Sequence, residues 1–266
     1  MSYTLTILGC GPSGGVPRIG QMWGNCDPEN PKNCRRRCGA LVQRFSENGV
    51  TRVLIDTSPD LRSQLIDVRV SELDGVLFTH DHADHTHGID DLRPVCFSTG
   101  RRIAVYGDAA TLQSLTSRFS YCFATKDGSG YSPILRSIEI SPGREVVIEG
   151  QGGPVRVLPI LQDHGPASSL GFRFGSLAYS PDVSNLPAQS VEMLNGLDVW
   201  IVDALRRMPH PSHFHLKKSL AWIERIKAKR AVLTHMMNDL DYDALLRELP
   251  PHIEPAYDGM AIEFDG

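Results

Sequence analysis

The sequence predicts an α/β fold in which two mixed β-sheets pack together and helices lie on their outer faces. Short runs of strand-forming residues alternate with helical patterns along most of the chain, and the third quarter consists mainly of alternating apolar and polar residues. The chain has 266 residues, 41% of them hydrophobic, and no long linker. We therefore expect one domain over residues 1–266, with a sizeable core.

The first half of the chain is expected to mix strands with short helices. Predicted strands cover residues 3–8, 40–45, 52–56, 74–79 and 102–106. The segment 56–60 is expected to cap a helix that continues to residue 66, and residues 109–119 form a second helical pattern. The aromatic and glycine-rich stretch 121–131 has no clear periodicity, which predicts a surface loop.

The second half begins with a predicted antiparallel sheet over residues 134–179, with strands at 144–149, 155–160, 170–174 and 176–179. Strands are also expected at 198–203, 231–234 and 260–264. Residues 216–227 carry apolar side chains at helical spacing, and residues 242–249 predict a last short helix.

Composition limits the classes of function. The formal net charge of −4 gives no general attraction to nucleic acids or anionic membranes. No stretch reaches the roughly 18 apolar residues of a membrane span, and no export signal is visible, so we expect a cytoplasmic protein. The six cysteines are then expected to be reduced thiols; they are Cys10, Cys26, Cys34, Cys38, Cys96 and Cys122.

A concentrated group of metal-binding residue types follows the predicted strand at 74–79. His80, His82, Asp84 and His85 offer imidazole and carboxylate ligands within six positions. In an extended turn His80 and His82 can face one side, while Asp84 and His85 begin a helix and face the other. One loop could therefore serve two cations at the ~3.5–4 Å spacing of two-metal hydrolases.

Three single residues follow later strands in the same way. They are His164, Asp182 and His235, after the strands near 155–160, 177–180 and 231–234. Loops at one rim of a sheet are common places for a site, so we expect these residues to converge on the histidine cluster. Two divalent ions, zinc or manganese, are the expected cofactors, since such ligands accept both.

The segment from Thr79 to His85 resembles the hallmark His-x-His-x-Asp-His motif of the metallo-β-lactamase superfamily. The resemblance implies a four-layer αβ/βα sandwich. It also implies that His80, His82 and His164 hold one ion, that Asp84, His85 and His235 hold the second, and that Asp182 bridges both. Further similarity, from the Gly-Val-Pro segment near the N-terminus to residues 255–259, is to the branch of ribonuclease Z and phosphonate-pathway cyclic phosphodiesterases.

Relatives in that branch often bind a structural zinc through Cys-x-Cys-x-x-Cys. Here seven residues separate Cys26 from Cys34 and three separate Cys34 from Cys38, so free thiols are expected instead. The glycine-rich segment 9–15 could present N–H groups to a phosphate, although a glycine turn alone is weak evidence. The run Arg35 to Arg37 could steer an anionic substrate or form a solvated face.

The predicted reaction is hydrolysis of a small, cyclic or linear, ribosyl or nucleotide phosphodiester by a hydroxide that bridges two metal ions. His213 resembles the additional histidine of that branch and is our candidate general acid or phosphate clamp. Its neighbours His210 and His215 compete for this role. Asp203 could accept a hydrogen bond from His213 and fix its tautomer.

Other functions remain open at this point. Lactonases, thioesterases and β-lactamases could use the same hydroxide on a carboxylic substrate, but they need no additional histidine. A tRNA 3′-processing nuclease shares the site, yet the basic, glycine-rich arm that it projects has no clear counterpart here, so no stable nucleic-acid partner is expected. A metal-stabilised binding module without turnover is the non-enzyme alternative. No membrane partner is expected, and a homodimer is left open.

Overall fold

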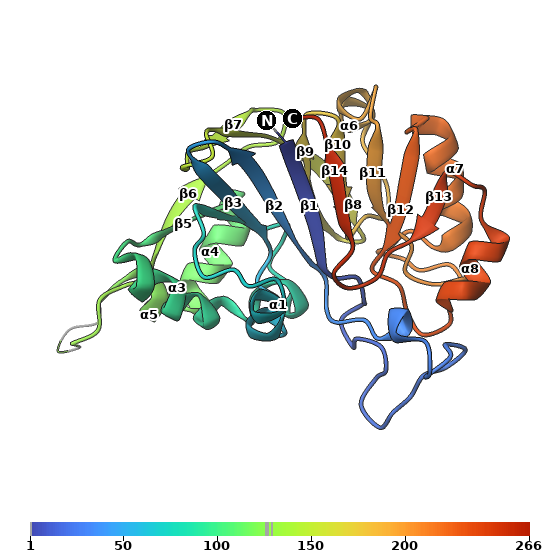
Figure 1. Ribbon diagram of the computed structural model, residues 1–266, viewed down its shortest axis with the longest axis horizontal. Helices are drawn as coiled ribbons and strands as arrows, with labels where there is room; N and C mark the ends of the chain where they lie inside the picture. The colour runs from blue at the N-terminus through green and yellow to red at the C-terminus, as the bar shows by residue number, and fades with distance from the viewer. Residues whose placement is uncertain (1, 126–127, 129) are drawn as a thin grey trace.

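The computed structural model describes residues 2–125, 128 and 130–266. Two seven-stranded sheets face each other, and helices lie on the outer face of each sheet (Figure 1). This arrangement confirms the predicted α/β sandwich of two mixed sheets. Both chain termini lie at one edge of the sandwich, and the long connection between β1 and β2 lies at the opposite edge (Figure 1).

The first sheet has the order β14-β1-β2-β3-β4-β5-β6 and is antiparallel from β14 to β3 but parallel from β3 to β6. Its strands, in chain order, are β1 (Ser2–Gly9), β2 (Gly39–Ser46), β3 (Gly49–Ile55), β4 (Gly75–Leu77), β5 (Ile103–Gly107), β6 (Leu135–Glu139) and β14 (Ala261–Phe264).

The second sheet has the order β13-β12-β11-β10-β9-β8-β7 and is parallel from β10 to β13. Its strands are β7 (Val146–Ile148), β8 (Val155–His164), β9 (Ala167–Phe174), β10 (Leu177–Ser180), β11 (Val199–Asp203), β12 (Arg230–Thr234) and β13 (Ile253–Pro255).

The helices of the first half are α1 (Leu61–Asp67), α2 (Ala83–Thr86), α3 (Leu92–Thr99), α4 (Ala109–Arg118) and α5 (Ser120–Phe123), with 3₁₀ turns at Pro31–Asn33 and Ile89–Asp91. Those of the second half are α6 (Ala188–Met193), α7 (Leu216–Ile226) and α8 (Tyr242–Glu248). None of the helices in the described part of the chain is long and apolar enough to cross a membrane.

Side chains along the strand β2 point alternately to the two faces of its sheet and contribute to two hydrophobic layers. In β2, Ala40 and Val42 face the space between the sheets, whereas Leu41 faces the helices outside the first sheet. All three side chains are buried, as expected of a strand covered on both faces.

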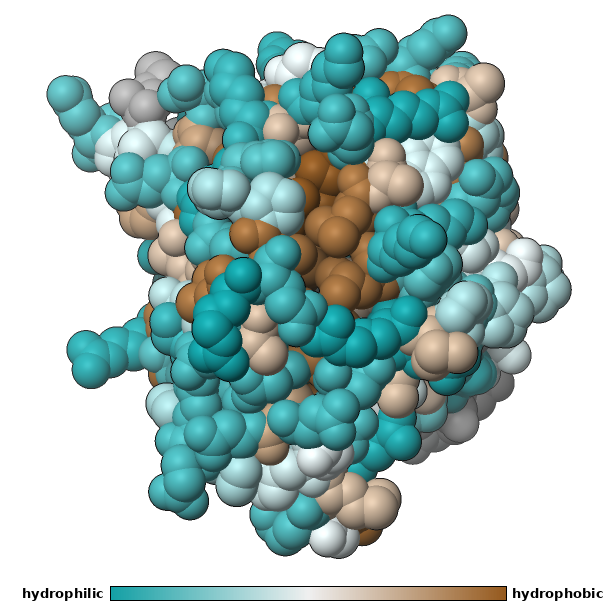
Figure 2. Space-filling view, turned by 90° about the vertical axis from the view of Figure 1, so that its right-hand side faces the viewer, coloured by the Kyte–Doolittle hydropathy of each residue, from teal (hydrophilic) through white to brown (hydrophobic). Residues whose placement is uncertain are grey.

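The face with α7, α8 and β13 has a central hollow of apolar side chains surrounded by hydrophilic ones (Figure 2).

Strand direction determines where the loops carrying the predicted site residues meet. In the second sheet β8 is parallel to β10, because both pair antiparallel with β9. The carboxyl ends of β8, β10, β11 and β12 therefore lie at the same edge, where His164, Asp182, Asp203 and His235 are found. The β4 strand of the facing sheet ends three residues before His80.

Several element predictions were wrong in detail. The stretch 134–179 is not one antiparallel sheet, because β6 instead pairs parallel with β5 in the first sheet. The short elements α3, α6 and β13 were missed, and α5 occupies the start of the predicted loop 121–131. Residues 126, 127 and 129 of that loop lie outside the described residues. Short buried elements have too few residues to show a clear period.

Candidate metal centre and active site

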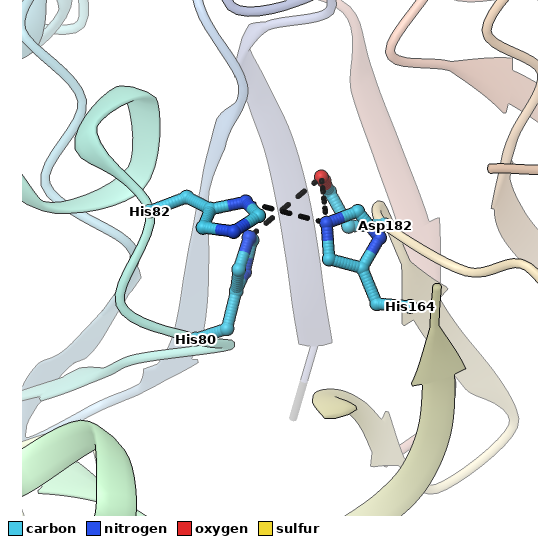
Figure 3. Close-up of side chains that lie close together, drawn as sticks. All are labelled: His80, His82, His164 and Asp182. Atoms are coloured by element: carbon cyan, nitrogen blue, oxygen red, sulfur yellow. Dashed lines mark hydrogen bonds and ion pairs between the residues drawn. The ribbon is translucent and has the colours of Figure 1, made fainter. Parts of the chain in front are cut away.

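Four side chains at or just after the ends of three strands form the first group of potential ligands. His80 and His82 follow β4, His164 ends β8, and Asp182 follows β10. One ligand atom from each lies within 4.8 Å of the others. Figure 3 shows the imidazoles turned toward one another, with His164 Nε2 3.3 Å from His82 Nδ1. His82 is exposed, so this group is open to solvent on one side.

A second group lies beside the first. It consists of Asp84 and His85 on α2 and His235 after β12, again with one ligand atom from each within 4.8 Å. Asp182 connects the two groups, because its Oδ1 is 3.1 Å from His85 Nε2 and its Oδ2 is 3.8 Å from His80 Nε2. The structure thus brings together the seven side chains that were named from the sequence.

The donor atoms in this cluster fit divalent cations. His80 Nε2, His85 Nε2 and Asp182 Oδ1 are buried and have no hydrogen-bond partner. The 3.1 Å approach of His85 to Asp182 therefore does not have hydrogen-bond geometry. Buried polar atoms are normally satisfied, so three unsatisfied atoms within one cluster indicate missing partners. Imidazole nitrogen and carboxylate oxygen are donors that zinc and manganese accept.

The charges of most groups in the cluster are also those of a cation site. His85 is the exception: burial lowers its pKa, but Asp182, Asp84 and Asp56 raise it by more. Burial lowers the pKa of His80, His164 and His235, that of His235 to about 4, so these imidazoles are neutral at neutral pH. Burial raises the pKa of Asp182, but the surrounding histidines lower it by more than burial raises it, so this carboxylate stays ionised. Neutral imidazoles and ionised carboxylates are the forms that bind metal.

His85 is held by a carboxylate that the sequence analysis assigned to another role. Its Nδ1 lies 2.7 Å from Asp56 Oδ2, and Asp56 also accepts hydrogen bonds from the backbone N–H and the hydroxyl group of Thr79. Asp56 was expected to help cap the helix after β3, but it is buried and does not cap that helix. A signal was available, because Asp56 directly follows a strand, as the other site residues do.

His213 lies next to the same cluster. Its Nε2 is 3.8 Å from Asp182 Oδ2, and its ring stacks on that of His235 with centroids 4.9 Å apart. Its Nδ1 lies 2.8 Å from Asp203 Oδ2, the contact predicted from the sequence. Burial lowers the pKa of His213, but the Asp203 carboxylate raises it more, to about 9.

The competing histidines are placed differently. His210 lies beside His213, with ring centroids 5.1 Å apart, and its Nδ1 faces the backbone N–H and hydroxyl group of Ser212. His215 is the residue before α7. Among these three histidines in the described chain, His213 is the one with a contact to Asp182.

The glycine-rich segment 9–15 is used for packing. A Cβ atom on Gly9 would lie 2.1 Å from Arg37 O, and one on Gly11 would lie 2.8 Å from Arg35 O. Side chains at these positions would therefore clash with the neighbouring backbone. The backbone N–H of Gly11 donates to Arg36 O, and that of Gly15 donates to Pro12 O. These two N–H groups are thus already engaged within the protein.

The run of three arginines is not a solvated face, because each of the three has partners within the protein. Arg35 is 1% exposed, and its guanidinium donates to the carbonyl oxygens of Met237 and Leu240 and to Asn33 Oδ1. Arg36 pairs with Asp67 and Asp258, and Arg37 pairs with Asp60. The expectation for Arg35 was wrong, because a single arginine can be buried when carbonyl oxygens satisfy it.

The cysteines near the N-terminus lie in separate places. Cys26 is buried near the guanidinium of Arg35, Cys34 is exposed, and Cys38 is buried beneath His235. No group of possible metal ligands among the described residues contains a cysteine. All six cysteines are free thiols in the structure.

Comparisons with known proteins agree with this geometry. The model of the Beta-lactamase superfamily domain matches residues 51–236, more than half of the chain. An octanoyltransferase from Porphyromonas gingivalis is 33% identical over 97% of this chain, and the chain spans 51% of that relative's length.

Solved structures show the same fold. A crystal structure described as a new diphosphatase from the PhnP family superposes with a TM-score of 0.87 at 36% identity, covering 99% of this chain and 98% of that one. Zinc-bound PqqB from Methylobacterium extorquens has a TM-score of 0.75 at 18% identity, with 97% and 99% covered. The chain therefore belongs to the β-lactamase superfamily, as a metal-binding hydrolase with the metallo-β-lactamase fold.

Proposed function

We propose that this hydrolase is a binuclear metal-dependent phosphodiesterase whose substrate is a small, cyclic or linear, ribosyl or nucleotide phosphodiester. The observation that carries the proposal is the pair of His213 and Asp203 beside the metal cluster. Cleavage of a phosphodiester produces an alkoxide leaving group that needs a proton. Acyl hydrolysis at such a centre needs no additional histidine at this position.

The two groups of ligands would each hold one ion. His80, His82 and His164 would bind the first, and Asp84, His85 and His235 the second, with Asp182 shared between them. When bound, the ions supply Lewis acidity, which lowers the pKa of a water molecule and offsets negative charge on the attacked phosphate. Zinc and manganese both fit this donor set.

The protein itself positions the proton donor. Because His213 Nδ1 donates to Asp203 Oδ2, the ring is fixed with Nε2 facing the cluster. Asp203 is buried at the end of β11 and also accepts a hydrogen bond from the backbone N–H of Val183, so it cannot swing away. The raised pKa of His213 favours the imidazolium form, which can either donate from Nε2 or hold an anionic oxygen.

One of the named relatives, the diphosphatase, supports phosphorus chemistry without selecting a substrate. The 36%-identical structure is described as a diphosphatase, which favours a phosphoanhydride as a second candidate bond. The octanoyltransferase is about twice as long as this chain, so its name does not assign an activity to the half that matches. A small phosphodiester or diphosphate is therefore the proposed partner. We also propose that residues 1–266 form a single domain.

A substrate panel with the metal-loaded protein tests this proposal. Bis(p-nitrophenyl) phosphate, a cyclic nucleotide, a dinucleoside diphosphate, a thioester and a lactone would be assayed after zinc or manganese loading, with the metal content of each sample measured. We expect turnover of one or more of the phosphorus substrates by a protein that holds two ions per chain. Turnover of the acyl substrates alone would reject the proposal.

A further inference from the structure

The imidazole of His235 is supported by a contact that differs from the one behind His85. His235 Nδ1 lies 3.2 Å from Cys38 Sγ, and that thiol is also 3.7 Å from the hydroxyl oxygen of Thr234. Cys38 is 0% exposed and lies just before β2, in the sheet opposite to the one that carries His235. The thiol therefore connects the two sheets directly beneath the proposed centre.

The backbone at His235 makes such support necessary. His235 has a φ of +58°, in the left-handed region that residues with a Cβ seldom adopt. This conformation brings the side chain toward Asp84 and His85 immediately after β12 ends. Such a backbone conformation persists only where the surrounding contacts hold it, and the contact of His235 with Cys38 is one of them.

We propose that Cys38 is a positioning residue that fixes the orientation and tautomer of His235 for metal binding, an inference that rests on the proposed two-ion centre. With the thiol as hydrogen-bond acceptor, His235 carries its proton on Nδ1 and leaves Nε2 free to bind a cation. The S–H group can at the same time point to the hydroxyl oxygen of Thr234. Histidine ligands commonly donate their second N–H group to such an outer partner.

One other group competes for the same nitrogen. Asp182 Oδ1 is 3.5 Å from His235 Nδ1, slightly farther than the sulfur atom. Asp182 lies within 3.8 Å of four further imidazoles, whereas the hydrogen-bond contact of Cys38 with a proposed ligand is the one with His235. Replacing Cys38 therefore perturbs one ion and leaves the ligands of the other untouched.

Two substitutions separate hydrogen bonding from packing. Cys38→Ser keeps a small acceptor, whereas Cys38→Val fills the space but cannot accept the N–H group. Cys96 provides a matched control, because it is a buried cysteine among the residues packed outside the first sheet and is remote from the site. Cys96→Ser and Cys96→Val make the same chemical changes in another part of the core.

The measurement is zinc binding to the full chain in competition with a chromophoric chelator, together with the visible spectrum of the cobalt-loaded protein. We expect Cys38→Val to weaken one of the two ions about tenfold or more and to change the cobalt spectrum, and Cys38→Ser to weaken it less. Both Cys96 variants should bind both ions as the wild type does.

Three results would overturn the inference. Cys38→Val could retain both ions with unchanged affinity, which would leave Asp182 as the partner of His235. It could instead weaken both ions equally, which would indicate general loosening of the core. The Cys96 variants could also have the same effect. Uptake of fewer than two zinc ions by the wild type would instead refute the proposed two-ion centre itself.

Discussion

The contact between Asp56 and His85 offers a sharp test of the second ion site, through the substitution Asp56→Asn. The new side chain has the same shape, and asparagine tolerates the left-handed backbone that Asp56 adopts at a φ of +63°. Its amide oxygen can still accept the backbone N–H of Thr79, now 2.8 Å from Asp56 Oδ1. The fold should therefore change little.

The effect falls on His85. The new NH₂ group replaces Asp56 Oδ2, which is 2.7 Å from His85 Nδ1, so it donates to this nitrogen. The imidazole proton then moves to Nε2, the atom that would bind the ion. Loss of an outer partner of this kind commonly weakens metal binding roughly 10–100-fold, which corresponds to about 1.4–2.7 kcal/mol.

The same zinc competition assay would measure this loss, with thermal unfolding recorded in parallel. Asp60→Asn is the control, since it removes the same charge four positions away, where the carboxylate pairs with Arg37. Asp56→Ala should destabilise the fold as well, because the donors of Thr79 and His85 lose their acceptor. We expect it to lower the free energy of unfolding by about 2–6 kcal/mol. If Asp56→Asn binds both ions as tightly as the wild type, the proposed role of His85 as a ligand is wrong.

Four further outcomes are expected. His213→Ala should lower turnover of the best phosphorus substrate about 10²–10⁴-fold while both ions stay bound. If a stopped assay gives the same rate for the variant and the wild type, His213 has a purely structural role. Removal of metal by a chelator should lower the unfolding temperature. Zinc added back at about 100 times its Kd should raise the free energy of unfolding by about 2.7 kcal/mol. If calorimetry shows no change, metal does not bind the folded state. Arg35→Met should lower the free energy of unfolding in urea by about 2–6 kcal/mol, because buried carbonyl oxygens lose their donors. The control Arg62→Met, at an exposed position, should leave this free energy unchanged. Burial raises the pKa of Asp241, but hydrogen bonds from Ala244, Asp27 and Asn33 lower it by more than burial raises it. The ionised carboxylate therefore stabilises the fold above about pH 4, and this stabilisation is lost as the pH falls through the folded-state pKa. Asp241→Asn should lower the free energy of unfolding at pH 7 and have no effect on it in strong acid.

The sequence predicted the residues that share a local pattern. The spacing from His80 to His85 and the strands before His164, Asp182 and His235 were sufficient to name a cluster that the structure brings together. The sheets followed from alternating and apolar runs, although the parallel pairing of β6 depends on a neighbour far along the chain. Strand partners of this kind are chosen by packing rather than by local pattern.

The supporting contacts could not be predicted in the same way. Asp56 lies 29 positions from His85, and Cys38 lies 197 positions from His235. Neither has a motif, and Asp56 also fitted the ordinary role of a residue before a helix. Arg35 was misjudged because charge normally indicates solvent exposure, and the carbonyl oxygens that surround it come from a loop some 200 positions away.

The burial of Arg35 has a consequence for how the molecule responds to metal loss. Its guanidinium fastens the segment that precedes β2 to the loop that follows β12, using only covalent side-chain atoms and backbone oxygens. These contacts to carbonyl oxygens involve no metal ion. Removal of the metal ions should therefore abolish the chemistry of the site, while the segment before β2 and the loop after β12 stay joined and the ions can be returned without refolding.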